Sequence, residues 1–209
     1  GAWAEGTGKE NIVIKSIIKD ENQDINVEKQ FEIPSCLNEE KEVYIAVRKG
    51  ILIHFILQNL DFGMLNTKEE IKNYISKLEL EKVISTKDSK YISISKIYNF
   101  LNSKIGNDLK KAKKIYREYE FILNSKKYSN SLIQGVIDLF YVTSENKVVL
   151  VDFKTDKLYN ADEFINRYRI QLEIYKEAIN TLTDYSVDKV YIYSFNLNKE
   201  IEIKEELNE

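Results

Sequence analysis

The sequence predicts an α/β fold, with helices in its first half and strands in most of its second half. The first half shows helical periodicity, in which apolar residues recur three or four positions apart. From Ile115 the period changes to two, which is typical of a strand with one buried face. At 209 residues the chain can form one domain of above-average size with a helical elaboration.

The composition is that of a globular chain and excludes several classes of protein. Hydrophobic residues make up 43% and charged residues 31%, and no apolar run approaches the roughly 20 residues of a membrane span. The single cysteine, Cys36, excludes an internal disulfide and an iron–sulphur cluster ligated by this chain alone. We therefore expect a cytoplasmic protein with no membrane contact.

The formal charge of −3 is mild evidence against a protein that binds nucleic acid by charge alone. A nuclease whose acidic cluster is neutralised by divalent cations can depart from that rule. Lysines do gather in and directly after the predicted helical segment 92–113, at Lys104, Lys110, Lys111, Lys113 and Lys114. They form either a solvated helix face or a path for a nucleic-acid backbone.

The N-terminal segment predicts little regular structure. The chain does not begin with Met, and residues 1–10 look like a linker or cloning remnant, so we expect a fragment of a longer chain with one domain over 11–209. The apolar patches 12–14 and 31–33 could form an edge hairpin or docking strands. Pro34 then breaks the chain.

Three helical segments are expected over 40–60, 66–81 and 92–113, the last as one or two helices interrupted near Gly106. Thr67, with Glu70 three residues on, is a plausible cap for the second. On the first, one face carries Val47, Gly50, Ile51, His54, Leu57 and Gln58. Gly50 leaves room for another element or a ligand. His54 is either a core histidine bonded to a backbone carbonyl or a ligand.

The second part of the chain, about 115–204, predicts strands and one helix. Strands are expected over 115–124, 131–143, 147–154 and 187–196, with a strand-like tail to Lys204. A tight turn over 144–146 joins the second and third of these strands. The helix 162–181 can be capped by Asn160 or Asp162.

Charged side chains interrupt two otherwise apolar strands. Asp152 and Lys154 are two apart and so leave the same face of their strand, while Phe153 points to the opposite face. Asp138 lies in a neighbouring strand, so one hairpin can bring the three charged groups together. Two close carboxylates repel each other unless a divalent cation relieves the repulsion, and oxygen ligands suit Mg²⁺ or Mn²⁺. The alternative is an exposed ion pair at a strand end.

The predicted helix 162–181 adds a polar-tipped stripe. Tyr168, Gln171 and Tyr175 are at spacings of three and four, flanked by Arg167 and Arg169. Such a stripe can hydrogen-bond phosphate or stack on a base. Ordinary core packing explains the tyrosines equally well.

These motifs together resemble those of the RecB-like PD-(D/E)xK nucleases, and most of all the C-terminal nuclease domains of AddA-type helicase–nucleases. The matching segments, over roughly 40–196, are Arg48-Lys-Gly-x-x-x-His54, Arg117-Glu118-x-x-Phe121, Gly135-x-Ile-Asp138-Leu, Asp152-x-Lys154-Thr-Asp and Gln171-x-x-x-Tyr175. The resemblance implies a restriction-endonuclease-like core, a mixed central sheet flanked by helices, with an α-helical insertion. It also implies a Mg²⁺-dependent deoxyribonuclease, in which Mn²⁺ can substitute.

The resemblance assigns roles to individual residues. It makes His54, Asp138, Asp152 and the Phe153 carbonyl metal ligands. Lys154 would be the catalytic lysine, and Gln171 and Tyr175 would organise the site. Glu118 would position Lys154 or approach a second metal.

The resemblance also implies partners. They would be DNA, expected to be single-stranded, a helicase portion of the same polypeptide, and an AddB-like subunit. No Walker A motif is present, so a motor must lie outside this chain. A stand-alone phage- or restriction-type exonuclease and a non-catalytic DNA-binding scaffold are the alternatives.

Overall fold

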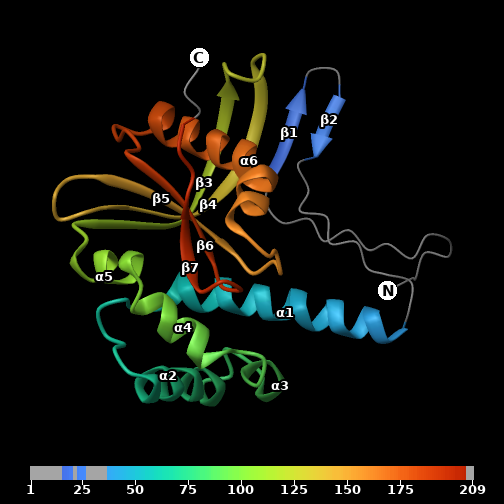
Figure 1. Ribbon diagram of the computed structural model, residues 1–209, viewed down its shortest axis with the longest axis vertical. Coiled ribbons are helices and arrows are strands. Elements are labelled where there is room, and N and C mark those ends of the chain that lie inside the picture. The colour runs from blue at the N-terminus through green and yellow to red at the C-terminus, as the bar shows by residue number, and fades with distance from the viewer. Residues whose placement is uncertain (1–15, 21–22, 27–36, 206–209) are drawn as a thin grey trace.

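The computed structural model describes residues 16–20, 23–26 and 37–205 (Figure 1). The described elements follow in chain order as β1 (Ser16–Asp20), β2 (Gln23–Asn26), α1 (Leu37–Asn59), α2 (Lys68–Leu80), α3 (Thr86–Ser89), α4 (Ile94–Leu101), α5 (Lys104–Lys111), β3 (Lys114–Ser125), β4 (Ser131–Val142), β5 (Val148–Lys154), α6 (Ala161–Leu182), β6 (Lys189–Ser194) and β7 (Lys199–Glu202). No described helix is long and apolar enough to cross a lipid bilayer.

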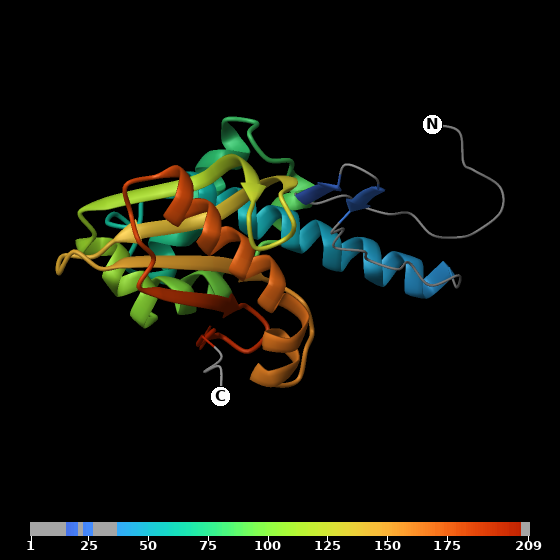
Figure 2. The same cartoon turned by 90° about the horizontal axis from the view of Figure 1, so that it is seen from above.

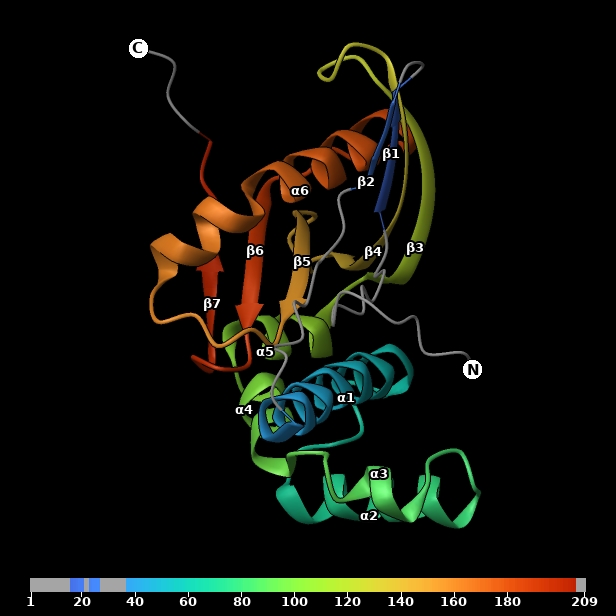
Figure 3. The same cartoon turned by 90° about the vertical axis from the view of Figure 1, so that its right-hand side faces the viewer.

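A twisted sheet separates two helical layers (Figure 3). One hydrophobic core joins α1, α2, α4 and α5 to the face of the sheet that carries Leu139, Val151 and Tyr193. The second core joins α6 to the opposite face, which carries Phe140, Leu150 and Ile192. Neighbouring residues of one strand thus serve different cores, as the alternation of a strand requires.

The sheet has seven strands in the order β2-β1-β4-β5-β6-β7, and β3 pairs with β4 off this path. The β5–β6 pair is parallel because α6 connects the two strands, whereas every other described pair is antiparallel. The prediction of an α/β fold with a mixed sheet flanked by helices is therefore confirmed. The strand-like tail is confirmed too, as β7.

The α1 helix lies at the end of the sheet toward which β5 and β6 point, and its N-terminal half extends beyond the sheet (Figures 2 and 3). Its buried side chains are those of Val47, Leu52, Ile53, Ile56 and Leu57. The helix face predicted to carry His54 is buried only in part. Ile51 is 40% exposed and Gln58 is exposed, because the buried stripe is centred on the other side of His54.

Local signals at helix ends are largely confirmed. The Thr67 hydroxyl accepts a hydrogen bond from the Glu70 amide, and Asn160 caps α6 through a bond from the Glu163 amide. The predicted break near Gly106 is displaced, since α4 ends before Asn102 and Gly106 lies inside α5. A Cβ on Gly106 would lie 2.3 Å from the Phe100 carbonyl oxygen, so glycine serves close packing there.

The sequence did not predict the helix α3, and it placed the N-terminal hairpin at other residues. The short helix α3 follows a Ser85 cap. The N-terminal hairpin consists of β1 and β2, and β1 pairs with β4. The apolar patches 12–14 and 31–33, expected to form strands, lie outside the described residues.

Candidate active site

The site lies in a fork between β4 and β5. The ladder between these strands runs from Val142↔Val148 to Leu139↔Val151 and ends there. At the next position the Asp138 side chain replaces the backbone as hydrogen-bond acceptor, because its Oδ2 accepts a hydrogen bond from the Phe153 amide over 2.9 Å. Asp138 therefore fills the point where the strands separate, and it is tied to the backbone between Asp152 and Lys154.

The β3–β4 ladder is interrupted at the same level. The register passes from Arg117↔Leu139 to Tyr119↔Ile137 and omits the pair of Glu118 with Asp138. Glu118 has a φ of 48°, in the left-handed region that a residue with a β-carbon rarely adopts. Strained backbone of this kind often occurs at functional sites.

Both strands change facing at this interruption. Tyr116 and Tyr119 pack into the core beneath α6, although residues three apart on a regular strand point to opposite faces. Phe140 and Ile137 of β4 likewise share that core. Because the ladder is interrupted at both residues, the side chains of Glu118 and Asp138 need not follow the regular alternation between the two faces of the sheet.

The freed carboxylates meet a histidine from α1. His54 Nδ1 lies 3.3 Å from Asp138 Oδ1. One potential ligand atom from each of His54, Glu118 and Asp138 lies within 4.8 Å of the other two, so these residues could hold a metal ion. The His54 ring also packs edge-on against Phe153, with the ring centres 5.9 Å apart.

Two contacts fix α1 in this position. A Cβ built on Gly50 would lie 2.8 Å from Thr155 Oγ1, so the glycine allows α1 to approach the segment after β5. The room that the sequence predicted at Gly50 is thus occupied by another element. Arg117 donates hydrogen bonds to the carbonyls of Leu57 and Leu60 at the end of α1.

Arg117 is a positioning residue. It belongs to the Arg117-Glu118-x-x-Phe121 motif, but the sequence predicted no role for it. Its guanidinium lies 4.1 Å from the centre of the Phe62 ring, and burial lowers the pKa of Arg117. It satisfies carbonyls that have no partner within α1 and so ties that helix to β3, beside Glu118. An arginine directly before Glu118 is the sequence signal for this contact.

On the α6 side of the fork lies a buried polar network. Lys154 forms an ion pair with Asp152 and donates a hydrogen bond to Gln171 Oε1 over 2.9 Å. Gln171 Nε2 in turn donates to the Tyr175 hydroxyl over 3.1 Å. Asp152, Lys154 and Gln171 are 2%, 1% and 7% exposed, so water cannot readily replace these bonds.

The structure shows which side chains of β5 point to each face of the sheet. Asp152 and Lys154 share one face of β5, and Phe153 packs into the opposite core, as expected. Asp152 is not in the His54–Glu118–Asp138 group, because its carboxylate turns toward Lys154. The assignments of Asp152 and the Phe153 carbonyl as metal ligands therefore stay predictions.

The tyrosine rings of the α6 stripe are packed in the core. Tyr168 and Tyr175 are buried, and Tyr175 meets Phe121 edge-on. Their hydroxyl groups are used within the protein, that of Tyr168 by Asp156 and that of Tyr175 by Gln171. The Lys154 ammonium also lies 4.2 Å from the centre of the Tyr168 ring. The core-packing alternative thus describes the rings.

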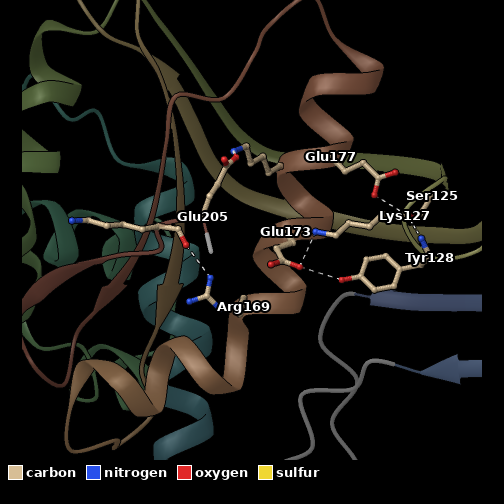
Figure 4. Close-up of polar contacts among 9 residues, drawn as sticks. Ser125, Lys127, Tyr128, Arg169, Glu173, Glu177 and Glu205 are labelled. Atoms are coloured by element: carbon tan, nitrogen blue, oxygen red, sulfur yellow. Dashed lines mark hydrogen bonds and ion pairs between the residues drawn. The ribbon is translucent and has the colours of Figure 1, made fainter. Parts of the chain in front are cut away.

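The outer side of α6 holds chain segments together (Figure 4). Arg169 donates a hydrogen bond to the Lys204 carbonyl, which anchors the segment after β7. Glu173 and Glu177 accept hydrogen bonds from Lys127 and Ser125 at the β3–β4 connection. A cleft of about 550 Å³ runs between these segments and lies apart from the fork.

The lysine-rich segment predicted as a possible nucleic-acid path begins at α5 and continues into β3. Lys104, Lys111, Lys113 and Lys114 are exposed, and Lys113 bonds to the Asn146 side chain. Lys114 pairs with Val142, at the end of β4 remote from residues 131–137. Lys114 and Glu118 are four residues apart on β3, which separates them by about 13 Å along the strand. The lysine-rich segment therefore lies away from the carboxylates of the fork.

Comparison with known proteins identifies the family. Residues 30–208, most of the chain, match the PD-(D/E)XK nuclease superfamily. The chain belongs to this superfamily. The fork is therefore the candidate active site of a PD-(D/E)XK nuclease domain, and the resemblance noted in the sequence is confirmed.

Three curated relatives are each described as a subunit of an ATP-dependent helicase/nuclease. The one from Clostridium botulinum is 36% identical over 92% of this chain, and the one from Clostridium perfringens is 32% identical over 91%. The one from Alkaliphilus oremlandii is 30% identical over 79%. This nuclease domain spans only 15–16% of their lengths.

One solved structure, that of protein VC1899 from Vibrio cholerae, aligns with 84% of this chain and 55% of its own. The TM-score is 0.31 and the sequence identity 12%, which is too low to support any argument.

Proposed function

We propose that this domain hydrolyses phosphodiester bonds of DNA with Mg²⁺, as the nuclease part of an AddA-type helicase–nuclease. The observation that carries the proposal is the convergence of His54, Glu118 and Asp138 beside the buried Asp152–Lys154 pair. The relatives described as helicase/nuclease subunits support it. A helicase portion of the same polypeptide and an AddB-like subunit would be the partners, in the repair and recombination of double-strand breaks.

The donor set fits a hard divalent cation. Its two carboxylates are the kind of ligand that Mg²⁺ and Mn²⁺ accept, and its one imidazole nitrogen is a softer ligand that favours Mn²⁺ over Mg²⁺. His54, Glu118 and Asp138 would hold the ion, with Asp152 and the Phe153 carbonyl as further candidates. When bound, the ion lowers the pKa of a coordinated water and withdraws charge from a phosphodiester oxygen.

The chain's own groups would prepare the attack on phosphorus. Lys154 is held by Asp152 and Gln171, so its ammonium is aimed before substrate arrives. From there it would hold the attacking water by a hydrogen bond and stabilise the charge that grows on the phosphate oxygens. Gln171 and Tyr175 would act as positioning residues.

Single-stranded DNA is the proposed substrate. The chain carries 34 acidic and 31 basic residues, so it lacks the positive excess that captures duplex DNA unaided. A motor that feeds a strand into the fork would remove the need for tight capture. In this arrangement the helicase delivers the strand and the nuclease domain cuts it.

The test is cleavage of end-labelled single-stranded and duplex DNA in Mg²⁺. Asp138→Asn and Lys154→Met are expected to lose at least about 10²-fold in rate. Glu120→Gln should stay near wild type, because Glu120 is exposed on the same strand as Glu118. Equal rates in all the proteins would place the activity elsewhere.

A calorimetric titration with Mn²⁺ tests the metal site without activity. Wild type and Glu120→Gln should bind, whereas His54→Ala and Asp138→Asn should bind more weakly, by about tenfold or more. A chain that neither cuts DNA nor binds Mn²⁺ would be a scaffold of the same fold.

A further inference from the structure

Three lysines from three different elements meet beside the fork. Lys49 lies in α1, Lys96 in α4, and Lys157 in the connection between β5 and α6. Gly50 approaches Thr155 closely, and Lys49 and Lys157 lie one and two residues along the chain from these two contact positions. Lys96 directly precedes Ile97, which packs in the same core as Leu52 and Ile53 of α1, and the charges of Lys49 and Lys157 act on its ammonium group.

None of the three has an acidic partner within the described part of the chain. No ion pair or side-chain hydrogen bond joins their ammonium groups to a carboxylate there. Asp156, the acid next to Lys157, is engaged by the Tyr168 hydroxyl and lies 3.9 Å from Arg167. Asp88, on α3, is engaged by Arg48.

This arrangement opposes the stability of the fold. Burial of Lys96 lowers its pKa, and repulsion from Lys49 and Lys157 lowers it further. The chain has more acidic than basic residues, so carboxylates are plentiful elsewhere. A cluster of like charges with no carboxylate partner among the described residues is suited to binding an anion.

The position of the cluster identifies the anion. Lys157 is three residues beyond Lys154, and Lys49 is five residues before His54 on α1. A strand whose phosphodiester reached the fork would pass its neighbouring phosphates over this surface. Lysine binds phosphate as a point charge and reads no sequence, which suits a nuclease that must accept any strand.

We propose that Lys49, Lys96 and Lys157 bind backbone phosphates of the DNA strand that enters the active site. The inference rests on the proposed function, since it identifies the strand path into the same site. In this proposal the three lysines bind DNA and take no part in the chemical step. The lysines of α5 and the start of β3 are not part of this path.

The experiment measures the salt dependence of binding by fluorescence anisotropy, using a labelled single-stranded oligonucleotide in EDTA. Each phosphate contact with a single strand contributes about 0.7 to the slope of log K against log salt. The triple variant Lys49→Gln, Lys96→Gln, Lys157→Gln should therefore lower the slope by about 2. Circular dichroism confirms that the variant is folded.

The matched control removes the same charge from the remote cluster, as Lys104→Gln, Lys111→Gln and Lys113→Gln. Its slope should equal that of wild type. An equal fall in both triple variants, or in neither, would overturn the proposal. So would a fall seen only with a 5′-phosphorylated oligonucleotide, because the site would then bind a terminal phosphate.

Binding in EDTA does not require cleavage, so the two proposals can fail separately. Suppose that wild type does not cut DNA in Mg²⁺, and that the salt dependence of binding falls only in the first triple variant. The cluster is then a DNA-binding site on a non-catalytic domain, and the binding inference stands. If wild type cuts DNA and the slope is unchanged in the first variant, the strand path is wrong and the nuclease proposal stands.

Discussion

Lys154 donates a hydrogen bond to Gln171 Oε1 over 2.9 Å, and both side chains are buried. Gln171 is held in turn by its bond to Tyr175, so a chain of polar contacts from α6 sets the direction of the lysine on β5. In the proposed catalytic role of Lys154, a side chain held in this way loses little conformational freedom when substrate binds.

Replacing Gln171 should therefore change catalysis more than binding. We expect Gln171→Leu to lower kcat by about 10²-fold with little change in KM, because misplacement of a catalytic group by about 1 Å has an effect of this size. Tyr175→Phe should cause a smaller loss, since it removes only the support behind Gln171. Steady-state kinetics on single-stranded DNA provide the measurement, and an unchanged kcat in Gln171→Leu would contradict the assignment.

The Asp152–Lys154 pair should also control stability. Lys154→Met leaves a buried carboxylate without its cation, which we expect to lower the free energy of unfolding by about 3–5 kcal/mol. Adding Asp152→Asn removes that charge and should restore most of the loss. Urea unfolding followed by circular dichroism compares the two variants. A double variant no more stable than Lys154→Met would show that the cost has another source.

The sequence predicted this side of the site because it depends on strand alternation. Asp152 and Lys154 are two apart, and Phe153 between them is apolar, so the period of two fixed their facing. Gln171 and Tyr175 are four apart on a helix and so meet along one face, although spacing could not show that their polar ends bond to each other.

The other side of the site could not be predicted in the same way. Alternation continued through Glu118 predicts that Tyr116 shares a face with Glu118, whereas Tyr116 shares a core with Tyr119. The change of facing requires a positive φ at Glu118, and no glycine or asparagine announces it. The lysine cluster was missed because its members are far apart in sequence and come from three elements.

The Arg48–Asp88 pair makes stability depend on pH. The hydrogen bond from Arg48 lowers the pKa of Asp88 below its usual value, so the stabilisation is present above about pH 3.9 and is lost as the pH falls through the lower pKa of the folded state. Both groups are partly exposed, so we expect Asp88→Asn to cost less than about 1 kcal/mol at pH 7. The difference from wild type should shrink below pH 3.9. Urea unfolding at several pH values measures it, and a constant difference would exclude the ion pair as its cause.

Gly50 allows α1 to lie close to Thr155, and this contact should couple the helix to the site. Alanine is favoured over glycine inside a helix by up to about 1 kcal/mol, so Gly50→Ala would stabilise an unobstructed α1. Here the new Cβ would lie 2.8 Å from Thr155 Oγ1, which forces the Thr155 side chain or α1 to move. We expect Gly50→Ala to lower cleavage of single-stranded DNA by about tenfold or more, because α1 carries His54 and a shift of α1 would move His54 relative to Lys154 on β5.

The double variant Gly50→Ala, Thr155→Ala separates this contact from other effects of the alanine. Removal of Oγ1 leaves the Thr155 Cβ, 3.8 Å away, as the nearest remaining atom of that side chain, an ordinary van der Waals distance. The double variant should therefore regain the activity of Thr155→Ala and unfold at a higher urea concentration than Thr155→Ala, by the helix preference for alanine. If the double variant stayed as inactive as Gly50→Ala, the glycine would be needed for something other than the approach of α1 to Thr155.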